Sequence, residues 1–132
     1  MADFKEVFDK ILDTEDTTDT YDPADISDTN IICAVGYLLF FIPLIAKPNS
    51  EFGKYHANQG LLLLITFFVV SIALHFACKG LNIIPFIGWL AASILEFAVN
   101  ISMIALFFVG FFNALSGKAK QLPFIGKFKI IK

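Results

Sequence analysis

The sequence predicts an all-α integral membrane protein, a helical bundle of three transmembrane helices. Of its 132 residues 57% are hydrophobic and 17% charged, whereas soluble domains average about 45–50% apolar and about 25% charged residues. Three runs lack charge, over residues 29–46, 55–78 and 80–117, the last broken only by Glu96. About 20 apolar residues cross a bilayer as a helix. The alternation of a barrel strand is absent, so we expect helices.

The first expected span covers residues 31–46 and is short for a crossing. At about 1.5 Å per residue it reaches about 24 Å. Pro43 falls in its last turn, where it would end or kink the helix.

The second and third spans are expected over residues 58–78 and 89–115. Between them, residues 81–88 contain Pro85 and Gly88 and precede the only Trp, so we expect an interfacial or re-entrant segment. A four-span alternative would need a turn near residues 96–100, where there is neither Gly nor Pro.

Residues 1–30 form an acidic N-terminal tail. Residues 3–13 place apolar side chains at helical spacing and predict an amphipathic helix. Its polar face is acidic, whereas helices on a membrane surface usually have a basic polar face. Two alternatives remain open: the helix docks on the membrane domain or on a partner, or it is frayed and has no target. Six Asp then recur every third residue from 13 to 28 among threonines. A solvated Asp/Thr-rich linker is favoured over a calcium site, because EF-hand spacing and Gly are absent.

Charge is divided unevenly along the chain. Residues 1–30 hold ten acids and two Lys, and residues 31–132 hold two acids and eight Lys. Three spans put Lys47, Lys54 and the C-terminal lysines on one side, so the positive-inside rule predicts a multi-pass cell-membrane protein with its N-terminus outside and C-terminus inside. There is no Arg and no soluble basic stripe, which argues against nucleic-acid binding.

Polar residues inside the expected spans are candidate functional positions. Ser93, Glu96 and Asn100 share one face of the third span, and His75 lies at a similar depth on the second. A charge at that depth costs several kcal/mol unless it is paired, protonated or hydrated. A Glu96–His75 contact would be either a structural hydrogen bond, the favoured interpretation, or part of a proton or substrate path.

Recognisable catalytic motifs and metal-ligand clusters are absent from the sequence, so we expect a non-enzyme without cofactor. Cys33 and Cys78 would lie on the same side in three spans. Two buried free thiols are favoured over a disulfide.

Residues 52–61, FGKYHANQGL, resemble the F-x-x-x-H-A-x-Q-x-L segment of a family of small membrane proteins that includes the chloroplast inner-envelope import component and many bacterial and archaeal members. Residues 22–26, Asn30 and residues 113–127 resemble the same family. The resemblance implies a component of a transport or protein-translocation assembly. His56, Asn58 and Gln59 are its motif residues, and an N-terminal helix cap is favoured over partner or lipid binding for them.

Residues 118–132 form a basic and apolar C-tail. Its lysines are candidate contacts to anionic lipid, with docking to a cytoplasmic partner as the alternative. They are Lys118, Lys120, Lys127, Lys129 and Lys132. The favoured function is thus a non-catalytic membrane component that associates with itself or with other membrane proteins. The alternatives are a scaffold or lipid-interacting protein and a proton-coupled site around Glu96.

Overall fold

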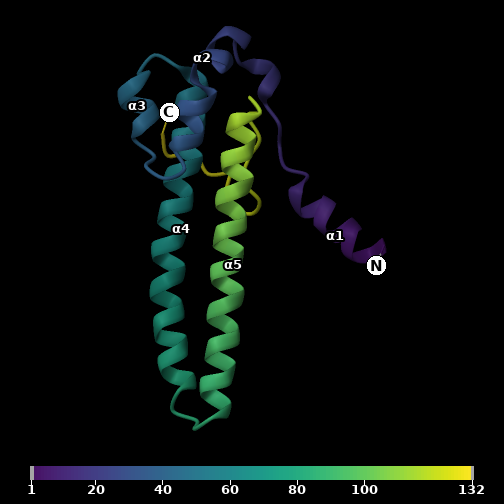
Figure 1. The fold of residues 1–132 in the computed structure, drawn as a ribbon, viewed down its shortest axis with the longest axis vertical. Helices are drawn as coiled ribbons and strands as arrows, with labels where there is room; N and C mark the ends of the chain where they lie inside the picture. Colours follow the sequence, from purple (N-terminus) through teal and green to yellow (C-terminus); the bar gives the residue numbers. More distant parts are fainter. Residues whose placement is uncertain (1, 132) are drawn as a thin grey trace.

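The fold consists of a head and a long stem (Figure 1). The computed structural model describes residues 2–131, and for Ala2, Asp3 and Phe8 it describes the backbone alone. The described residues form helices and turns without a β-strand, apart from one isolated bridge between Asp16 and Lys120. We call residues 13–63 and 110–131 the head, and residues 64–109 the stem.

Two long helices form an antiparallel hairpin that runs the length of the molecule. α4 spans Glu51–Leu81 and α5 spans Ile87–Leu115, and both are long and apolar enough to cross a membrane. They contain the predicted spans over residues 58–78 and 89–115. Since α5 continues without a break through residues 96–100, the four-span alternative is wrong.

The predicted first span over residues 31–46 does not form one helix, which corrects the three-span bundle. α2, over Pro23–Val35, is followed by a turn, and the short α3, over Ile42–Ala46, packs against both α2 and α4. Gly36 permits this reversal, because a Cβ at that position would lie 2.7 Å from Cγ of Pro43. Pro43 therefore lies in the first turn of a new helix, where its missing N–H is harmless.

α2 begins inside the region predicted as an acidic linker. The Asp22 carboxylate accepts a hydrogen bond of 3.0 Å from Ala24 N, and Pro23 occupies the first turn. This is a standard combination of an N-cap residue and a proline at the helix start. The first two turns of α2 thus use residues that the period-three pattern had assigned to a linker.

The N-terminal tail lies along the C-terminal tail in the head. α1 covers Ala2–Leu12, against the predicted residues 3–13, and projects from the head beside the stem (Figure 1). After it, Thr14 Oγ1 donates to Gln121 O at 2.6 Å and Thr17 N donates to Ala119 O at 2.9 Å. The paired segments of the two tails thus lie together in the head, at one end of the hairpin. The expected orientation, with an outer N-terminus and an inner C-terminus, stays a prediction.

Residues 82–86 form the turn between α4 and α5 at the far end of the stem. The expected interfacial segment over residues 81–88 is thus the tip of the hairpin. The re-entrant alternative does not apply there, because Leu81 still belongs to α4 and Ile87 already belongs to α5.

The hydrophobic core lies in the head, where α2, α4, α5 and the C-tail meet. Small residues allow the close approach: a Cβ on Gly60 of α4 would lie 2.5 Å from the carbonyl oxygen of Gly36, and a Cβ on Gly110 of α5 would overlap the Tyr37 ring. Such glycine contacts are typical of helices packed in membranes. The core is built from Cys33, Ala34, Tyr37, Phe52, Leu63, Ala114, Ala119 and Leu122.

Candidate functional site

The motif residues of α4 hold the C-terminal tail by its backbone. Gln59 is buried; its side-chain amide donates to Gly126 O at 3.0 Å, and its Oε1 accepts from Leu122 N at 3.0 Å. One residue earlier, Asn58 donates to Phe128 O at 2.9 Å and accepts from Ile130 N at 2.7 Å and from Ile131 N at 3.0 Å. The two amide side chains thus bond backbone groups of the C-tail, whose described residues belong to no helix or strand. We call this arrangement the tail clamp.

His56 completes the tail clamp one turn before Gln59 on α4. It is fully buried, with Nε2 2.9 Å from Lys118 O and Nδ1 2.7 Å from the Tyr37 hydroxyl. A carbonyl oxygen can only accept, so Nε2 carries a proton; in the neutral ring, Nδ1 then accepts from the Tyr37 hydroxyl. These two bonds hold the histidine ring between the tail and the turn after α2.

Two residues of α2 bind the ends of the long helices. The Asp25 carboxylate accepts from Ser50 Oγ at 2.6 Å and from Phe52 N at 3.1 Å, at the N-terminus of α4. Asn30 donates to Leu115 O at 3.1 Å, at the C-terminus of α5. A carboxylate at a helix N-terminus and a donor at a C-terminus both satisfy backbone groups that lack partners within the helix.

The motif therefore has one mechanical consequence. Its polar atoms are used within the chain, and they fix α2, the C-tail and the ends of α4 and α5 to each other. The expected helix cap at the N-terminus of α4 exists, but Asp25 and Ser50 supply it; Ser50 Oγ accepts from Gly53 N at 2.9 Å. Sequence reasoning missed Asp25, Asn30 and Tyr37 as members of this network.

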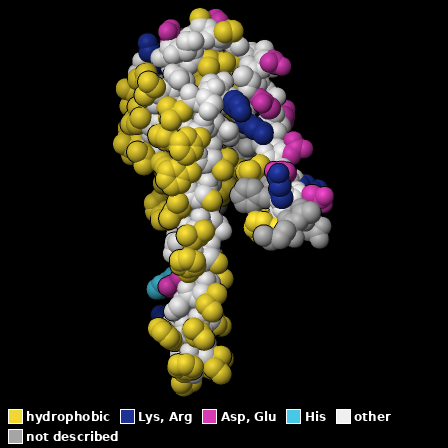
Figure 2. All heavy atoms as spheres, turned by 45° about the vertical axis from the view of Figure 1, so that its right-hand side comes forward, with side chains coloured by type: hydrophobic (Ala, Val, Ile, Leu, Met, Phe, Trp, Pro, Cys, Tyr) yellow, Lys and Arg dark blue, Asp and Glu magenta, His cyan; other side chains and the backbone are white. Residues whose placement is uncertain are grey.

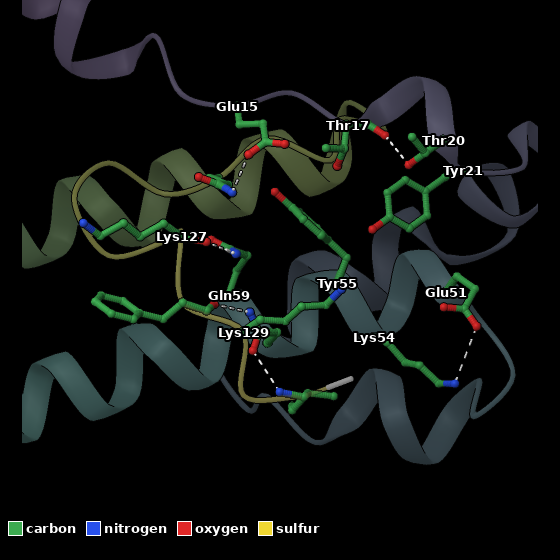
Figure 3. A pocket seen from close by; sticks show the side chains of 15 residues that line it. Glu15, Thr17, Thr20, Tyr21, Glu51, Lys54, Tyr55, Gln59, Lys127 and Lys129 are labelled. Carbon is green, nitrogen blue, oxygen red and sulfur yellow. Dashed lines mark hydrogen bonds and ion pairs between the residues drawn. The ribbon is translucent and has the colours of Figure 1, made fainter.

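A cavity of about 320 Å³ opens in the head between the two tails and α4 (Figure 3). The Tyr55 hydroxyl is buried there and has no hydrogen-bond partner among the described residues. In Figure 3 the side chains of Lys54 and Lys127 point away from each other, and Lys54 Nζ lies 3.7 Å from the Glu51 carboxylate. Lys54 and Lys127 therefore do not converge on one anion.

The C-tail lysines lie on the surface of the head or at its edge. Lys118, Lys127 and Lys129 are exposed and Lys120 is half-buried, while Lys132 lies outside the described residues. The Lys127 ammonium lies 5.6 Å from the centre of the Phe128 ring. These lysines can meet anionic headgroups wherever the head touches a bilayer.

The stem carries the intramembrane polar candidates. Cys78 Sγ lies 3.8 Å from Ala92 O, which brings the end of α4 beside the first turns of α5. His75 precedes Cys78 by three residues and Glu96 follows Ala92 by four, so both lie at one level of the antiparallel pair. Figure 2 shows acidic and histidine side chains at one level of the largely apolar stem. The expected Glu96–His75 bond stays a prediction.

The other stem candidates are satisfied locally or exposed. Ser93 Oγ donates to Trp89 O at 2.9 Å in its own helix, and the side chain of Asn100 is exposed like those of His75 and Glu96. The sequence pattern thus identified a polar level on the stem, and the structure leaves most of it uncovered by the chain itself.

The two cysteines are far from each other in the fold. Cys33 lies in the core of the head, and Cys78 lies near the far end of the hairpin. Both are free and buried, as favoured from the sequence. Burial raises the pKa of Cys33 to about 12, so its thiol stays protonated at neutral pH.

The acidic repeat does not gather into an ion site. No group of three His, Cys, Asp or Glu that could hold a metal ion occurs among residues 2–131. Individual members have local tasks: Asp22 caps α2, Asp25 caps α4, and Asp16 accepts from the backbone N–H and hydroxyl of Thr18. These hydrogen bonds lower the pKa of Asp16.

Comparison with known proteins finds two archaeal relatives, both UPF0132 membrane proteins of Methanocaldococcus jannaschii. One is 33% identical over 103 residues, which cover 75% of this chain and 83% of the relative. The other is 29% identical over 103 residues, which cover 75% of this chain but only 66% of the relative. No family model and no solved structure matches the chain.

Proposed function

The chain belongs to the UPF0132 family of membrane proteins, and we propose that it is a non-catalytic subunit of a membrane assembly that forms when the stems of two copies pack together. The single observation that supports this proposal is the uncovered polar level of the stem, with His75, Glu96 and Asn100 exposed on helices that are apolar enough to cross a bilayer.

The energetic reason is the cost of polar groups in hydrocarbon. In the most apolar windows of α4 and α5, 17% and 6% of the residues are buried within the chain. Lipid covers apolar side chains well, but an ionisable group such as Glu96 costs several kcal/mol unless it finds a partner. Two stems related by a two-fold axis would bring Glu96 of each copy to His75 of the other, since such an interface repeats every contact.

The hairpin supports a membrane placement with the head on one side. Of the described lysines, Lys79 lies on the stem, Lys5 and Lys10 lie on α1, and all the others lie in the head. By the positive-inside rule, the head with both termini faces the cytoplasm of a cell-membrane protein. There the exposed C-tail lysines would meet anionic lipid, each contributing about 1 kcal/mol near the surface.

The resemblance of residues 52–61 to the import-component family supports transport or protein translocation as the setting of such an assembly. In this chain those residues form the tail clamp. They would therefore contribute a stable head to the assembly.

Energy transfer between donor- and acceptor-labelled copies in lipid vesicles tests self-association. We expect transfer well above that of random neighbours, a decrease in both His75→Ala and Glu96→Ala, and no further decrease in the double variant. Ser102→Ala is the matched control, because that exposed hydroxyl bonds within its own helix to Ala98 O at 2.9 Å. Random-level transfer for the unchanged chain, or equal transfer in all variants, would contradict the proposal.

A proton-coupled site is the second candidate, favoured by the shared level of Glu96 and His75 on the stem. It predicts pH-dependent flux in reconstituted vesicles that Glu96→Gln removes while self-association persists. Flux that is unchanged in Glu96→Gln would eliminate this candidate.

A further inference from the structure

Two short segments of the chain, far apart in sequence, adopt the same turn. They read Ile-Pro-Phe-Ile-Gly over residues 84–88 and Leu-Pro-Phe-Ile-Gly over residues 122–126. In the first, Ile87 N donates to Pro85 O at 2.7 Å and Gly88 N donates to Ile84 O at 3.1 Å. In the second, the corresponding bonds measure 2.8 and 3.0 Å. The short bond spans three residues, so each segment contains a γ-turn inside a five-residue loop.

The residue at the centre of each turn is a phenylalanine with positive φ. Phe86 has φ 64° and ψ −61°, and Phe124 has φ 69°. A γ-turn of this hand is rare, and a bulky residue at positive φ costs about 1–3 kcal/mol. They are the only non-glycine residues with positive φ among residues 2–131. Such a cost, repeated at the same position of two matching segments, indicates a function for the turn.

Glycine closes both turns for a steric reason. A Cβ on Gly88 would overlap the backbone of Leu81, and a Cβ on Gly126 would overlap the backbone of Leu122. The related segment Ile42–Ala46 lacks both the phenylalanine and the glycine, and it forms helix α3 instead. The combination of Pro, Phe and Gly therefore accompanies this turn, and proline alone does not.

The turn places the aromatic ring outside the protein. Phe86 is 74% exposed and Phe124 is 77% exposed, more than most hydrophobic side chains of the molecule. Apolar neighbours surround them at both sites: Ile83 and Trp89 are exposed near Phe86, and Phe128 is exposed near Phe124. Each turn thus forms an apolar projection with an aromatic ring at its centre.

The distance between the two turns matches a bilayer. The first turn follows Leu81 at the end of α4, and the second is held at the level of Gln59, whose amide donates to Gly126 O at 3.0 Å. From Gln59 to Asn82 the rise of α4 is about 34 Å at about 1.5 Å per residue. The hydrocarbon core of a bilayer is about 30 Å thick, and aromatic side chains favour its two boundaries.

We propose that the two turns are a matched pair of membrane anchors, in which Phe86 inserts at the boundary of one leaflet and Phe124 at the boundary of the other. The ligand is the lipid bilayer itself, at the depth where acyl chains meet headgroups. The tail clamp then has a purpose, since it fixes the second anchor at the correct height on α4. The inference requires the hairpin to cross the bilayer, but it does not require self-association.

Depth-dependent quenching of a single tryptophan tests the proposal. In the full chain with Trp89→Phe, a tryptophan is introduced by Phe86→Trp, by Phe124→Trp or, as a mid-stem control, by Phe97→Trp. Each variant is reconstituted in phosphatidylcholine vesicles that carry bromine near the headgroup end or deep in the acyl chain. We expect stronger quenching by shallow than by deep bromine at both anchor positions, and the reverse order at position 97.

Two results would overturn the proposal. The first is a tryptophan at position 124 that neither lipid quenches, since the second turn would then lie in water. The second is stronger deep than shallow quenching at position 86 or 124. Phe86→Asn and Phe124→Asn separate loss of the ring from disturbance of the turn, because Asn tolerates positive φ and lacks the ring. These variants should keep the melting temperature in detergent and lower it in vesicles; equal melting in vesicles would also contradict anchoring.

Discussion

The head and the stem use polar residues in opposite ways. In the head, His56, Asn58 and Gln59 are buried, and each bonds backbone atoms of the C-tail. In the stem, His75 and Glu96 are exposed on two helices that pack against each other. Similar residue types thus complete the fold in one region and are available for contacts outside the chain in the other. Polar residues inside an apolar sequence therefore indicate a function only where the chain leaves them uncovered.

The largest expected difference in thermal stability between a head variant and a stem variant comes from two glycines of α4. Gly60→Ala would put a Cβ 2.5 Å from the Gly36 carbonyl oxygen, whereas a Cβ on Gly80 meets nothing within 4 Å. Overpacking costs about 1–3 kcal/mol, so Gly60→Ala should lower the melting temperature in detergent. Gly80→Ala should leave it unchanged or raise it, because alanine favours helix by about 1 kcal/mol. Equal melting of both variants would refute the tight packing of α2 on α4.

The next largest effect is expected when a residue of the tail clamp is removed. Gln59→Ala leaves Leu122 N and Gly126 O without their partners, at about 1–3 kcal/mol for a buried unsatisfied group. We expect faster hydrogen exchange over residues 122–131 and faster cleavage at the C-tail lysines by trypsin. The control is Gln121→Ala, whose side-chain bond to Glu15 is exposed. Unchanged exchange in Gln59→Ala would show that the tail is held by other contacts.

Two aspartates of α2 allow a capping carboxylate to be compared with an exposed one within the head. Asp25→Ala removes the acceptor for Ser50 Oγ and Phe52 N at the start of α4, while Asp28 is exposed. Loss of such a cap costs about 0.5–2 kcal/mol. The melting temperature should fall for Asp25→Ala and stay near that of the unchanged chain for Asp28→Ala. A larger loss in Asp28→Ala would be inconsistent with the observed cap.

The smallest effect concerns pH and the N-terminal tail. Hydrogen bonds from Thr18 lower the pKa of Asp16 below its ordinary value of 3.8. A carboxyl with a lowered folded-state pKa adds stability above its unfolded pKa, and this stability is lost as pH falls through the folded pKa. Protection from hydrogen exchange over residues 14–20, relative to the intrinsic exchange rate at each pH, should therefore fall only below about pH 4. Asp16→Asn should remove that fall in protection, and a loss of protection near neutral pH would point to another group.

The sequence was sufficient for the long helices but not for the head. Uncharged runs predicted α4 and α5 closely, because only helices satisfy the backbone across a bilayer. The apolar run over residues 31–46 was misread, since hydropathy does not distinguish a crossing helix from a helix and turn that fold back. The sequence features that mark the helix and its end are the Asp22–Pro23 start signal and Gly36.

The tail clamp was out of reach for a different physical reason. Asn58 and Gln59 bond backbone atoms about 70 residues away in sequence, such as Phe128 O and Gly126 O. Such a contact depends on the path of the tail, which has no periodicity of its own. By contrast, the matching Pro-Phe-Ile-Gly segments over residues 85–88 and 123–126 can be read directly from the sequence, although the positive φ values of their phenylalanines cannot.

The central claim is a hairpin with both chain ends on the cytoplasmic side, and single-cysteine labelling of intact cells tests it most directly. With Cys33 and Cys78 replaced by alanine, a cysteine is introduced at residue 5, 83 or 129, and an impermeant maleimide is added outside. We predict labelling at residue 83 alone, and labelling of all three positions after the cells are opened. Labelling of residue 5 but not of residue 129 in intact cells would contradict the hairpin and restore three crossings.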